Sequence, residues 1–202
     1  MKITTEMIKE LRQATSAGLL DCREALEACE GDFDEAVVYL REKGLASVAK
    51  KSGRKASEGT IEAYVHSDNT GNRMAVMLEL NCETDFVAKT DDFKNLAHDL
   101  ALHIAFGAPS YMTRKDVPEQ VIESARTDYR AQALEEGKPE NVVARIVDGR
   151  LEKFYQQVCL MEQSFVKDED KTIEHLINDA IAKLGENIVL RRFVRYEVGE
   201  GL

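Results

Sequence analysis

The sequence has no long hydrophobic run, and this absence excludes a membrane-spanning helix. No stretch approaches the roughly 20 apolar residues that such a helix needs. The opening residues, MKITTEMIKE, contain no secretory apolar segment. We therefore expect a cytoplasmic protein that stays where it is made and has no membrane partner.

The sequence has fewer basic than acidic residues, and this balance limits the kind of ligand that it can bind. The 202 residues include 27 lysines and arginines against 37 aspartates and glutamates, for a formal net charge of −10 at pH 7. Because neutralisation of phosphates dominates binding to nucleic acids, this balance argues against direct binding of DNA or RNA. Hydrophobic residues make up 44% and charged residues 32%, as in an ordinary globular protein. A protein partner or a small ligand fits this composition better.

Metal-binding and redox patterns are also missing. No two cysteines form a CxxC pair, and no histidines form an HExxH motif. The cysteines lie in otherwise apolar patterns, which favours structural thiols in a reducing compartment. The residues concerned are Cys22, Cys29, Cys82, Cys159, His66, His98, His103 and His175. We expect no metal site and no cofactor.

The sequence lacks the common motifs of nucleotide and serine enzymes. It contains no GxxxxGK[ST], no GxGxxG after a strand pattern and no GxSxG. One enzyme interpretation stays open, in which Cys82 is a nucleophile and His98 is its base. Cys82 shares a predicted strand face with Leu78 and Leu80, however, and this would bury the thiol. We therefore predict that the chain is not an enzyme and has no catalytic residue.

The first fifty residues predict three short helices. Gly31 ends the second helix, Asp32 with Glu35 forms a capping box for the third, and Gly44 closes the third. The apolar positions at helical spacing are Met7, Ile8 and Leu11, then Leu19, Cys22, Leu26 and Cys29, then Phe33, Ala36, Val37 and Leu40. A bundle of this size buries little surface, so we expect residues 1–52 to be a recognition module.

A basic segment, AKKSGRKASEG, follows the third predicted helix. Its bases are Lys50, Lys51, Arg54 and Lys55. They could contact RNA or an acidic partner surface, but the acidic balance of the whole chain favours a solvated linker or helix end. We place the domain boundary here, with a core over residues 53–202.

Period-two patterns in the core predict strands. Alternation over 61–65 and 74–82, on either side of the polar turn SDNTGN, predicts a β-hairpin with one solvated face. The segment IVLRRFVRYEV, at 188–198, is rich in β-branched and aromatic residues and predicts a last strand. Strands before and after a helical block favour an α+β fold with a small antiparallel sheet covered by helices.

Helical patterns fill the space between these strands. A helix with an acidic first turn begins near Asp91. Pro118 suits the first turn of another helix, and the pattern that continues to Tyr155 predicts a helical hairpin. An apolar stripe over 173–184 stops at Gly185 and predicts one more helix.

The segment NCETDFVAKTDDF, residues 81–93, places an acid and an aromatic residue at the end of the second strand. If the alternation continued past Cys82, Phe86 would point into the core. Thr84 and Asp85 are poor strand formers that readily make local turns, which favours a break in the alternation. Phe86 then points outward from a tight strand-to-helix connection and serves as an exposed anchor for a partner.

The same segment resembles the signature of bacterial elongation factor Ts, the guanine nucleotide exchange factor for elongation factor Tu. The segments KELRQATSAGLLDCREALEACEGDFDEAV and GENIVLRRFVRYEVGEG add to the similarity, which spans essentially the whole chain. The resemblance implies an N-terminal ubiquitin-associated-like (UBA-like) three-helix domain followed by an α+β core. It also implies binding to elongation factor Tu, in its GDP-bound and nucleotide-free forms, during translation elongation.

The resemblance assigns the residues of the candidate site. It implies that Thr84, Asp85, Phe86 and Val87 reach the GTPase domain of elongation factor Tu near its Mg²⁺ site. We expect Phe86 to enter an apolar slot and Asp85 to pair with polar groups there. Release of GDP and Mg²⁺ would follow.

Further partner contacts are expected outside this loop. By the same resemblance, the N-terminal domain grips elongation factor Tu through Leu11, Arg12, Gly18 and Leu20. Longer members of the family carry two related core subdomains, whereas this chain shows one, which implies a homodimer. The alternative function is a non-catalytic scaffold, in which the UBA-like module binds other helical or ubiquitin-like partners and the core only dimerises.

Overall fold

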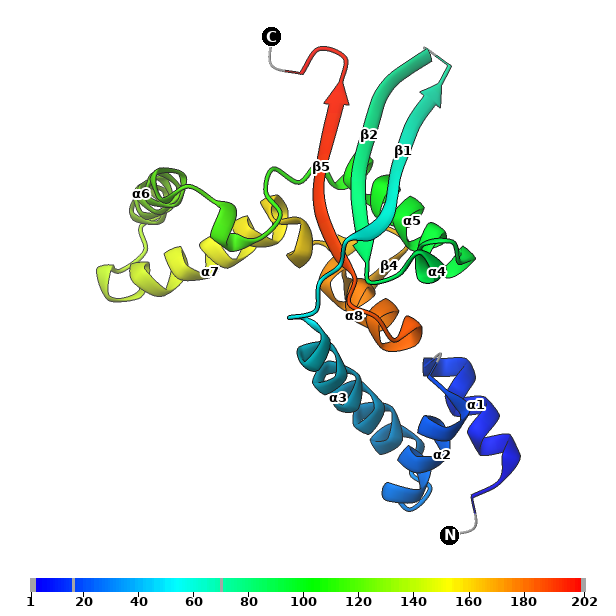
Figure 1. Cartoon of the computed structure of the whole chain (residues 1–202). Coiled ribbons are helices and arrows are strands. Elements are labelled where there is room, and N and C mark those ends of the chain that lie inside the picture. Colours follow the sequence, from blue (N-terminus) through cyan, green and yellow to red (C-terminus); the bar gives the residue numbers. More distant parts are fainter. Residues whose placement is uncertain (1–2, 16, 70, 201–202) are drawn as a thin grey trace. The chain divides into compact units, whose positions relative to one another are not determined.

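The computed structural model describes residues 3–15, 17–69 and 71–200 (Figure 1). Contacts between residues divide the chain into two compact units. The first comprises Met1–Glu62, Leu78–Ala97 and His175–Arg191, and the second comprises Ala63–Met77, His98–Glu174 and Arg192–Leu202. Each unit is assembled from segments far apart in the sequence, so a domain boundary between residues 52 and 53 stays a prediction.

Three helices form the N-terminal bundle. They are α1 (Thr5–Thr15), α2 (Leu19–Ala28) and α3 (Phe33–Lys51). The buried core of the bundle consists of Leu11, Cys22, Ala25, Leu26 and Ala36. Asp32 caps α3, because its Oδ1 atom accepts a hydrogen bond of 2.9 Å from the backbone N–H of Glu35. The predicted helical bundle is confirmed.

Helix α3 is longer than the sequence predicts. The prediction that Gly44 closes this helix is wrong, because α3 continues to Lys51. The residues that follow Gly44, LASVAKK, are mostly good helix formers, and they outweigh the cost of one glycine. Nζ of Lys51 lies 3.4 Å from the carbonyl oxygen of Ile181 in α8 (Ile173–Leu184). The basic segment therefore begins as a helix end that contacts α8.

A three-stranded antiparallel sheet belongs to the core. Its strands, in spatial order, are β1 (Glu58–Asp68), β2 (Gly71–Cys82) and β5 (Val189–Glu197). Every second residue in the second half of β2 is buried, namely Val76, Leu78, Leu80 and Cys82. The predicted hairpin, the alternation along β2 and the last strand are confirmed.

Helices α5 (Asp91–Gly107) and α8 supply apolar faces at helical spacing. The buried residues are Phe93, Leu96, Ala97, Leu100, Ala101, Ile104 and Ala105 in α5, and Ile173, Ile177 and Ile181 in α8. Nε of Arg195 in β5 donates a hydrogen bond of 3.0 Å to the carbonyl oxygen of Ala105, which ties the end of α5 to the sheet. The predicted α+β fold class is confirmed (Figure 1).

A helical hairpin completes the predicted set. It consists of α6 (Glu119–Glu135) and α7 (Glu140–Val158), with Gly137 in the turn at φ 72°. The two helices bury Ala133, Val143, Val147 and Leu151 against each other. The hairpin that begins after Pro118 is therefore confirmed.

One small feature was not predicted. The strands β3 (Ser164–Phe165) and β4 (Asp168–Thr172) pair in an antiparallel manner. β4 reads DEDKT and is almost entirely exposed. Since neither face of this strand is apolar, its sequence shows no alternation that could have announced it.

Candidate functional site

The candidate site is the connection between β2 and α5. Strand alternation stops after β2, and the short helix α4 (Asp85–Ala88) begins three residues later. Thr84 is the N-cap of α4, with extended backbone angles of φ −127° and ψ 154°. Its Oγ1 atom accepts a hydrogen bond of 3.4 Å from the N–H of Val87, as threonine commonly does at this position. Thr84 therefore turns the chain from strand into helix.

Phe86 points into solvent from this connection, with 80% of its surface exposed. An exposed phenylalanine forgoes the roughly 1.5–3 kcal/mol that burial of its side chain would provide. Single exposed apolar residues are common on protein surfaces. An aromatic ring on a loop fixed by hydrogen bonds, however, has the form of a binding anchor.

Asp85 lies beside Phe86 and pairs with Lys89. Nζ of Lys89 donates a hydrogen bond of 2.5 Å to Oδ2 of Asp85 across one helical turn. This bond holds the pKa of Asp85 below its ordinary value and raises the pKa of Lys89. Both side chains are largely exposed, so solvent screens the pair. The carboxylate of Asp85 is therefore partly accessible from solvent.

Cys82 holds the loop as a protonated thiol. It is fully buried, and its Sγ atom donates a hydrogen bond of 3.1 Å to the carbonyl oxygen of Thr84. Burial, with the nearby charge of Glu186, raises the pKa of Cys82 to about 11. A nucleophilic thiol needs a lowered pKa. His98, its suggested base, packs edge-on against Tyr64, so the geometry does not support a thiol enzyme.

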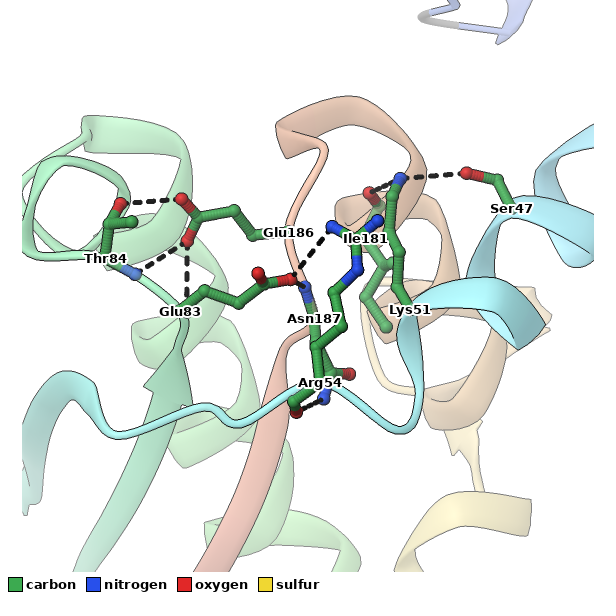
Figure 2. Close-up of polar contacts among 8 residues, drawn as sticks. All are labelled: Ser47, Lys51, Arg54, Glu83, Thr84, Ile181, Glu186 and Asn187. Atoms are coloured by element: carbon green, nitrogen blue, oxygen red, sulfur yellow. Dashed lines mark hydrogen bonds and ion pairs between the residues drawn. The ribbon is translucent and has the colours of Figure 1, made fainter.

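Glu186 also holds Thr84. It lies in the turn between α8 and β5 and accepts hydrogen bonds from the N–H and the hydroxyl of Thr84, at 3.0 and 2.6 Å (Figure 2). Sequence reasoning missed this residue, because 102 positions separate the two partners. The one available signal was that Glu186 belongs to GENIVLRRFVRYEVGEG, the second core segment that carries the family resemblance.

The N-terminal candidates divide by exposure. Leu20 is 77% exposed, and Arg12 and Gly18 are also exposed. Leu11 is fully buried in the bundle core, so its assignment as a partner contact is corrected: the side chain packs the three helices together. Leu19, expected on the buried face, is 51% exposed and forms an apolar surface pair with Leu20 that sequence reasoning missed.

The described part of the chain shows neither a metal-binding cluster nor a membrane-spanning helix. No three histidine, cysteine, aspartate or glutamate side chains in residues 3–15, 17–69 and 71–200 are grouped to hold a metal ion. Over the same ranges, no helix combines the length and the apolar character needed to cross a membrane. The anchored loop with its exposed aromatic residue remains the strongest candidate.

The fold and the site together define an α+β protein with an N-terminal helical bundle, a helical hairpin and an exposed aromatic residue at a strand-to-helix junction. The chain matches the family model "Elongation factor TS" over residues 2–200. It is 57% identical over 200 residues to "Elongation factor Ts" of Carboxydothermus hydrogenoformans. The matched region covers 99% of this chain and 91% of the relative. It is 57% identical over 195 residues to the protein of the same name from Moorella thermoacetica, covering 96% and 95%.

A third relative, "Elongation factor Ts" of Thermoanaerobacter sp. strain X514, is 54% identical over 200 residues, covering 99% of this chain and 97% of the relative. The chain therefore belongs to the elongation factor Ts family. The resemblance drawn from three sequence segments is confirmed, and with it a place among translation elongation factors.

Proposed function

We propose that this protein is a guanine nucleotide exchange factor that acts on elongation factor Tu in the cytoplasm and promotes release of GDP and Mg²⁺. The observation that carries the proposal is the 80% exposure of Phe86 on an anchored loop within the family's signature segment. No residue of this chain needs to perform chemistry. The proposed partner is elongation factor Tu in its GDP-bound and nucleotide-free forms, without direct contact to nucleic acid.

The mechanism follows from linked binding equilibria. In a GTPase, Mg²⁺ bridges the phosphates and the protein, and backbone N–H groups cradle the phosphates. A factor that binds the nucleotide-free form more tightly than the bound form must weaken nucleotide binding, and nucleotide must weaken binding of the factor by the same ratio. GDP is released when the factor binds, and GTP later displaces the factor.

The loop would supply the differential contacts. Phe86 enters an apolar slot between elements of the GTPase, and Asp85 exchanges Lys89 for polar or charged groups beside the Mg²⁺ site. Thr84 and Val87 fix the turn that presents both side chains. Displacement of the GTPase elements disturbs Mg²⁺ coordination and the phosphate cradle, which frees the metal and the diphosphate.

The loop alone is too small for this task. A population shift of about 10⁴ needs roughly 5.5 kcal/mol of differential binding, whereas burial of one phenylalanine supplies only about 1.5–3 kcal/mol. The N-terminal bundle supplies further grip. Its exposed candidates are Arg12, Gly18 and Leu20, to which the structure adds Leu19.

We also propose that the chain forms a homodimer through the sheet. Tyr64 and His66 of β1 contact the rings of His98 and Phe106 in α5, so these two strand residues face that helix. The neighbouring Val65 is 50% exposed and faces the other way. Exposed apolar residues on strands of the same sheet include Val65, Met77, Val194 and Tyr196.

Because this chain shows one core subdomain where longer members of the family carry two, we expect a second copy of the chain to cover this face of the sheet. Another chain would then supply the second core subdomain that longer members of the family carry within one chain. Gel filtration with light scattering tests the dimer. A strict monomer at micromolar concentration would exclude it.

The exchange proposal is tested by release of a fluorescent GDP analogue from elongation factor Tu in a stopped-flow instrument. Phe86→Ala should keep measurable affinity for elongation factor Tu and lose most of the acceleration. Phe106→Ala, at another exposed aromatic residue, is the matched control and should accelerate release normally. Unaffected release with Phe86→Ala would show that the wedge role is wrong.

The same assay separates the alternative function. A non-catalytic scaffold would bind elongation factor Tu, or another helical partner, without accelerating GDP release. An exchange factor accelerates release at concentrations below that of its partner, because it is not consumed. Wild-type protein that binds and does not accelerate would support the scaffold.

A further inference from the structure

The turn between α8 and β5 contacts Glu83 and Thr84, which precede Phe86 in the chain (Figure 2). Oε2 of Glu186 accepts hydrogen bonds of 3.0 Å from the N–H groups of both Glu83 and Thr84, and Oε1 accepts one of 2.6 Å from the hydroxyl of Thr84. Each of these bonds has a carboxylate as its acceptor, and bonds of this kind are stronger than neutral ones. One side chain therefore fixes the backbone and the side chain of the N-cap residue.

The contact between the two segments also runs in the opposite direction. Oε1 of Glu83 accepts a hydrogen bond of 2.7 Å from the N–H of Asn187, which is 4% exposed. Nδ2 of Asn187 donates a bond of 2.8 Å to the carbonyl oxygen of Arg54. Each segment thus supplies a carboxylate to the backbone of the other (Figure 2). This exchange fixes the position of the loop relative to the turn.

The N–H, the hydroxyl and the carbonyl oxygen of Thr84 all form hydrogen bonds within the protein. Its N–H and hydroxyl donate to Glu186, and its carbonyl oxygen accepts hydrogen bonds from Cys82 at 3.1 Å and from the N–H of Ala88 at 3.3 Å. Phe86 follows two residues later, in the helix that Thr84 caps. The direction of the exposed ring is therefore set by the position of Thr84.

We propose that Glu186 is a positioning residue for nucleotide exchange. Its carboxylate holds Thr84 so that Phe86 is presented in its binding geometry before elongation factor Tu arrives. A loop ordered in advance avoids the entropy loss that a flexible loop incurs on binding. Glu186 acts through Thr84 and need not touch the partner. This inference rests on the proposed function of Phe86.

The hydrogen bonds are tested first without the partner. Glu186→Gln keeps the size of the side chain but replaces the charged carboxylate with a neutral amide, whose single oxygen accepts hydrogen bonds more weakly. We expect hydrogen exchange of the Glu83 and Thr84 amides to become about tenfold faster in this variant, as measured by NMR. Glu152→Gln, which removes a carboxylate paired with Arg114, is the matched control. Equal exchange in all three proteins would overturn the proposal.

The role in nucleotide exchange is tested by a double-mutant cycle. Glu186→Gln should lower the maximal acceleration of GDP release about tenfold, and Glu152→Gln should leave it unchanged. In the Phe86→Ala protein, Glu186→Gln should cause a much smaller further loss, because most of its effect passes through the missing ring and only the position of Asp85 is left to disturb. A full additional loss in the double variant would overturn the proposal, since it would indicate a general structural effect.

The outcomes distinguish this inference from the proposed function. If Phe86→Ala is defective and Glu186→Gln is normal, only the positioning role is wrong. If Phe86→Ala is normal, the wedge role of Phe86 is wrong and the positioning role fails with it. If the wild-type protein does not accelerate GDP release, the proposed function itself is wrong. Should Glu186→Gln not unfold cooperatively, Thr84→Val removes the hydroxyl, and with it the bond to Glu186 and the cap bond from Val87. Both measurements should then shift in the same direction.

Discussion

His103 in α5 and Gln163 are joined by a hydrogen bond of 2.9 Å in the protein interior, where 1% and 6% of their surfaces are exposed. The backbone N–H of Val166 donates to Nδ1 of His103 at 3.3 Å. Nδ1 therefore carries no proton, Nε2 donates to Gln163, and the imidazole is neutral. Burial accordingly holds the pKa of His103 below its ordinary value.

We predict that His103 makes the fold less stable in mild acid. The unfolded chain binds a proton at this residue near pH 6.5, whereas the folded protein binds it only at lower pH. The free energy of unfolding should therefore fall as the pH drops below about 6.5, by up to about 1.4 kcal/mol per pH unit for one proton. Urea unfolding at several pH values measures this slope. His103→Gln should reduce it, and an equal slope in both proteins would contradict a neutral His103.

The two leucines assigned to the N-terminal grip should behave in opposite ways. Leu20→Ala, at an exposed position, should change the free energy of unfolding by less than about 0.5 kcal/mol. It should weaken binding to elongation factor Tu about tenfold, because the side chain is buried on binding. Leu11→Ala, in the bundle core, should cost roughly 2–5 kcal/mol of stability. Calorimetry measures the change in the free energy of unfolding, and titration with elongation factor Tu measures the change in affinity. Normal binding by Leu20→Ala would remove this residue from the grip.

Arg114 should fix the base of the helical hairpin. Its Nη2 atom lies 2.6 Å from carboxylate oxygens of both Glu152 and Glu162, and its guanidinium carbon lies 4.6 Å from the ring centroid of Tyr155. We predict that Arg114→Lys accelerates hydrogen exchange in α7, because lysine cannot form the bidentate contact or stack flat on the ring. Loss of the ring contact alone is worth about 0.5–1 kcal/mol. Arg130→Lys, at an exposed pair of the same hairpin, is the control, and equal exchange in both variants would contradict the anchor.

Two glycines of the hairpin should respond differently to alanine. Gly149 lies inside α7, and a Cβ there would meet no atom within 4 Å beyond the backbone of its own helix and its chain neighbours. Gly149→Ala should therefore stabilise the protein by about 1 kcal/mol through helix propensity. Gly137 has a φ of 72°, so Gly137→Ala should destabilise by about 1–2 kcal/mol. Thermal unfolding compares them, and a destabilised Gly149→Ala protein would contradict the open helix surface.

The sequence by itself was sufficient where a local pattern carried the information. The apolar spacing of β2 and α8 predicted which residues face the core, and Asp32 marked the start of α3. Thr84 and Asp85 indicated that the alternation breaks before Phe86, and the structure exposes that ring. These features depend on residues within a few positions of one another, so the sequence contains them directly.

Predictions from local sequence were wrong where the same segment was compatible with two different structures. Gly44 is a common helix end, yet α3 continues through it because the following residues favour helix. Leu19 fits the apolar face of α2 by spacing but lies at the first helical position, where the bundle leaves it half exposed. Leu11 and Leu20 look alike in sequence, and packing alone buries the first and exposes the second.

The sequence determined most of the helices, the three strands of the main sheet and the break that frees Phe86, because each arises from interactions between near neighbours along the chain. Only the tertiary structure decided that Glu186 holds Thr84 and that Val65 faces away from α5. Which distant groups meet, and which of two apolar faces is covered, depends on how the elements pack. That packing is a property of the whole chain, and no short segment specifies it.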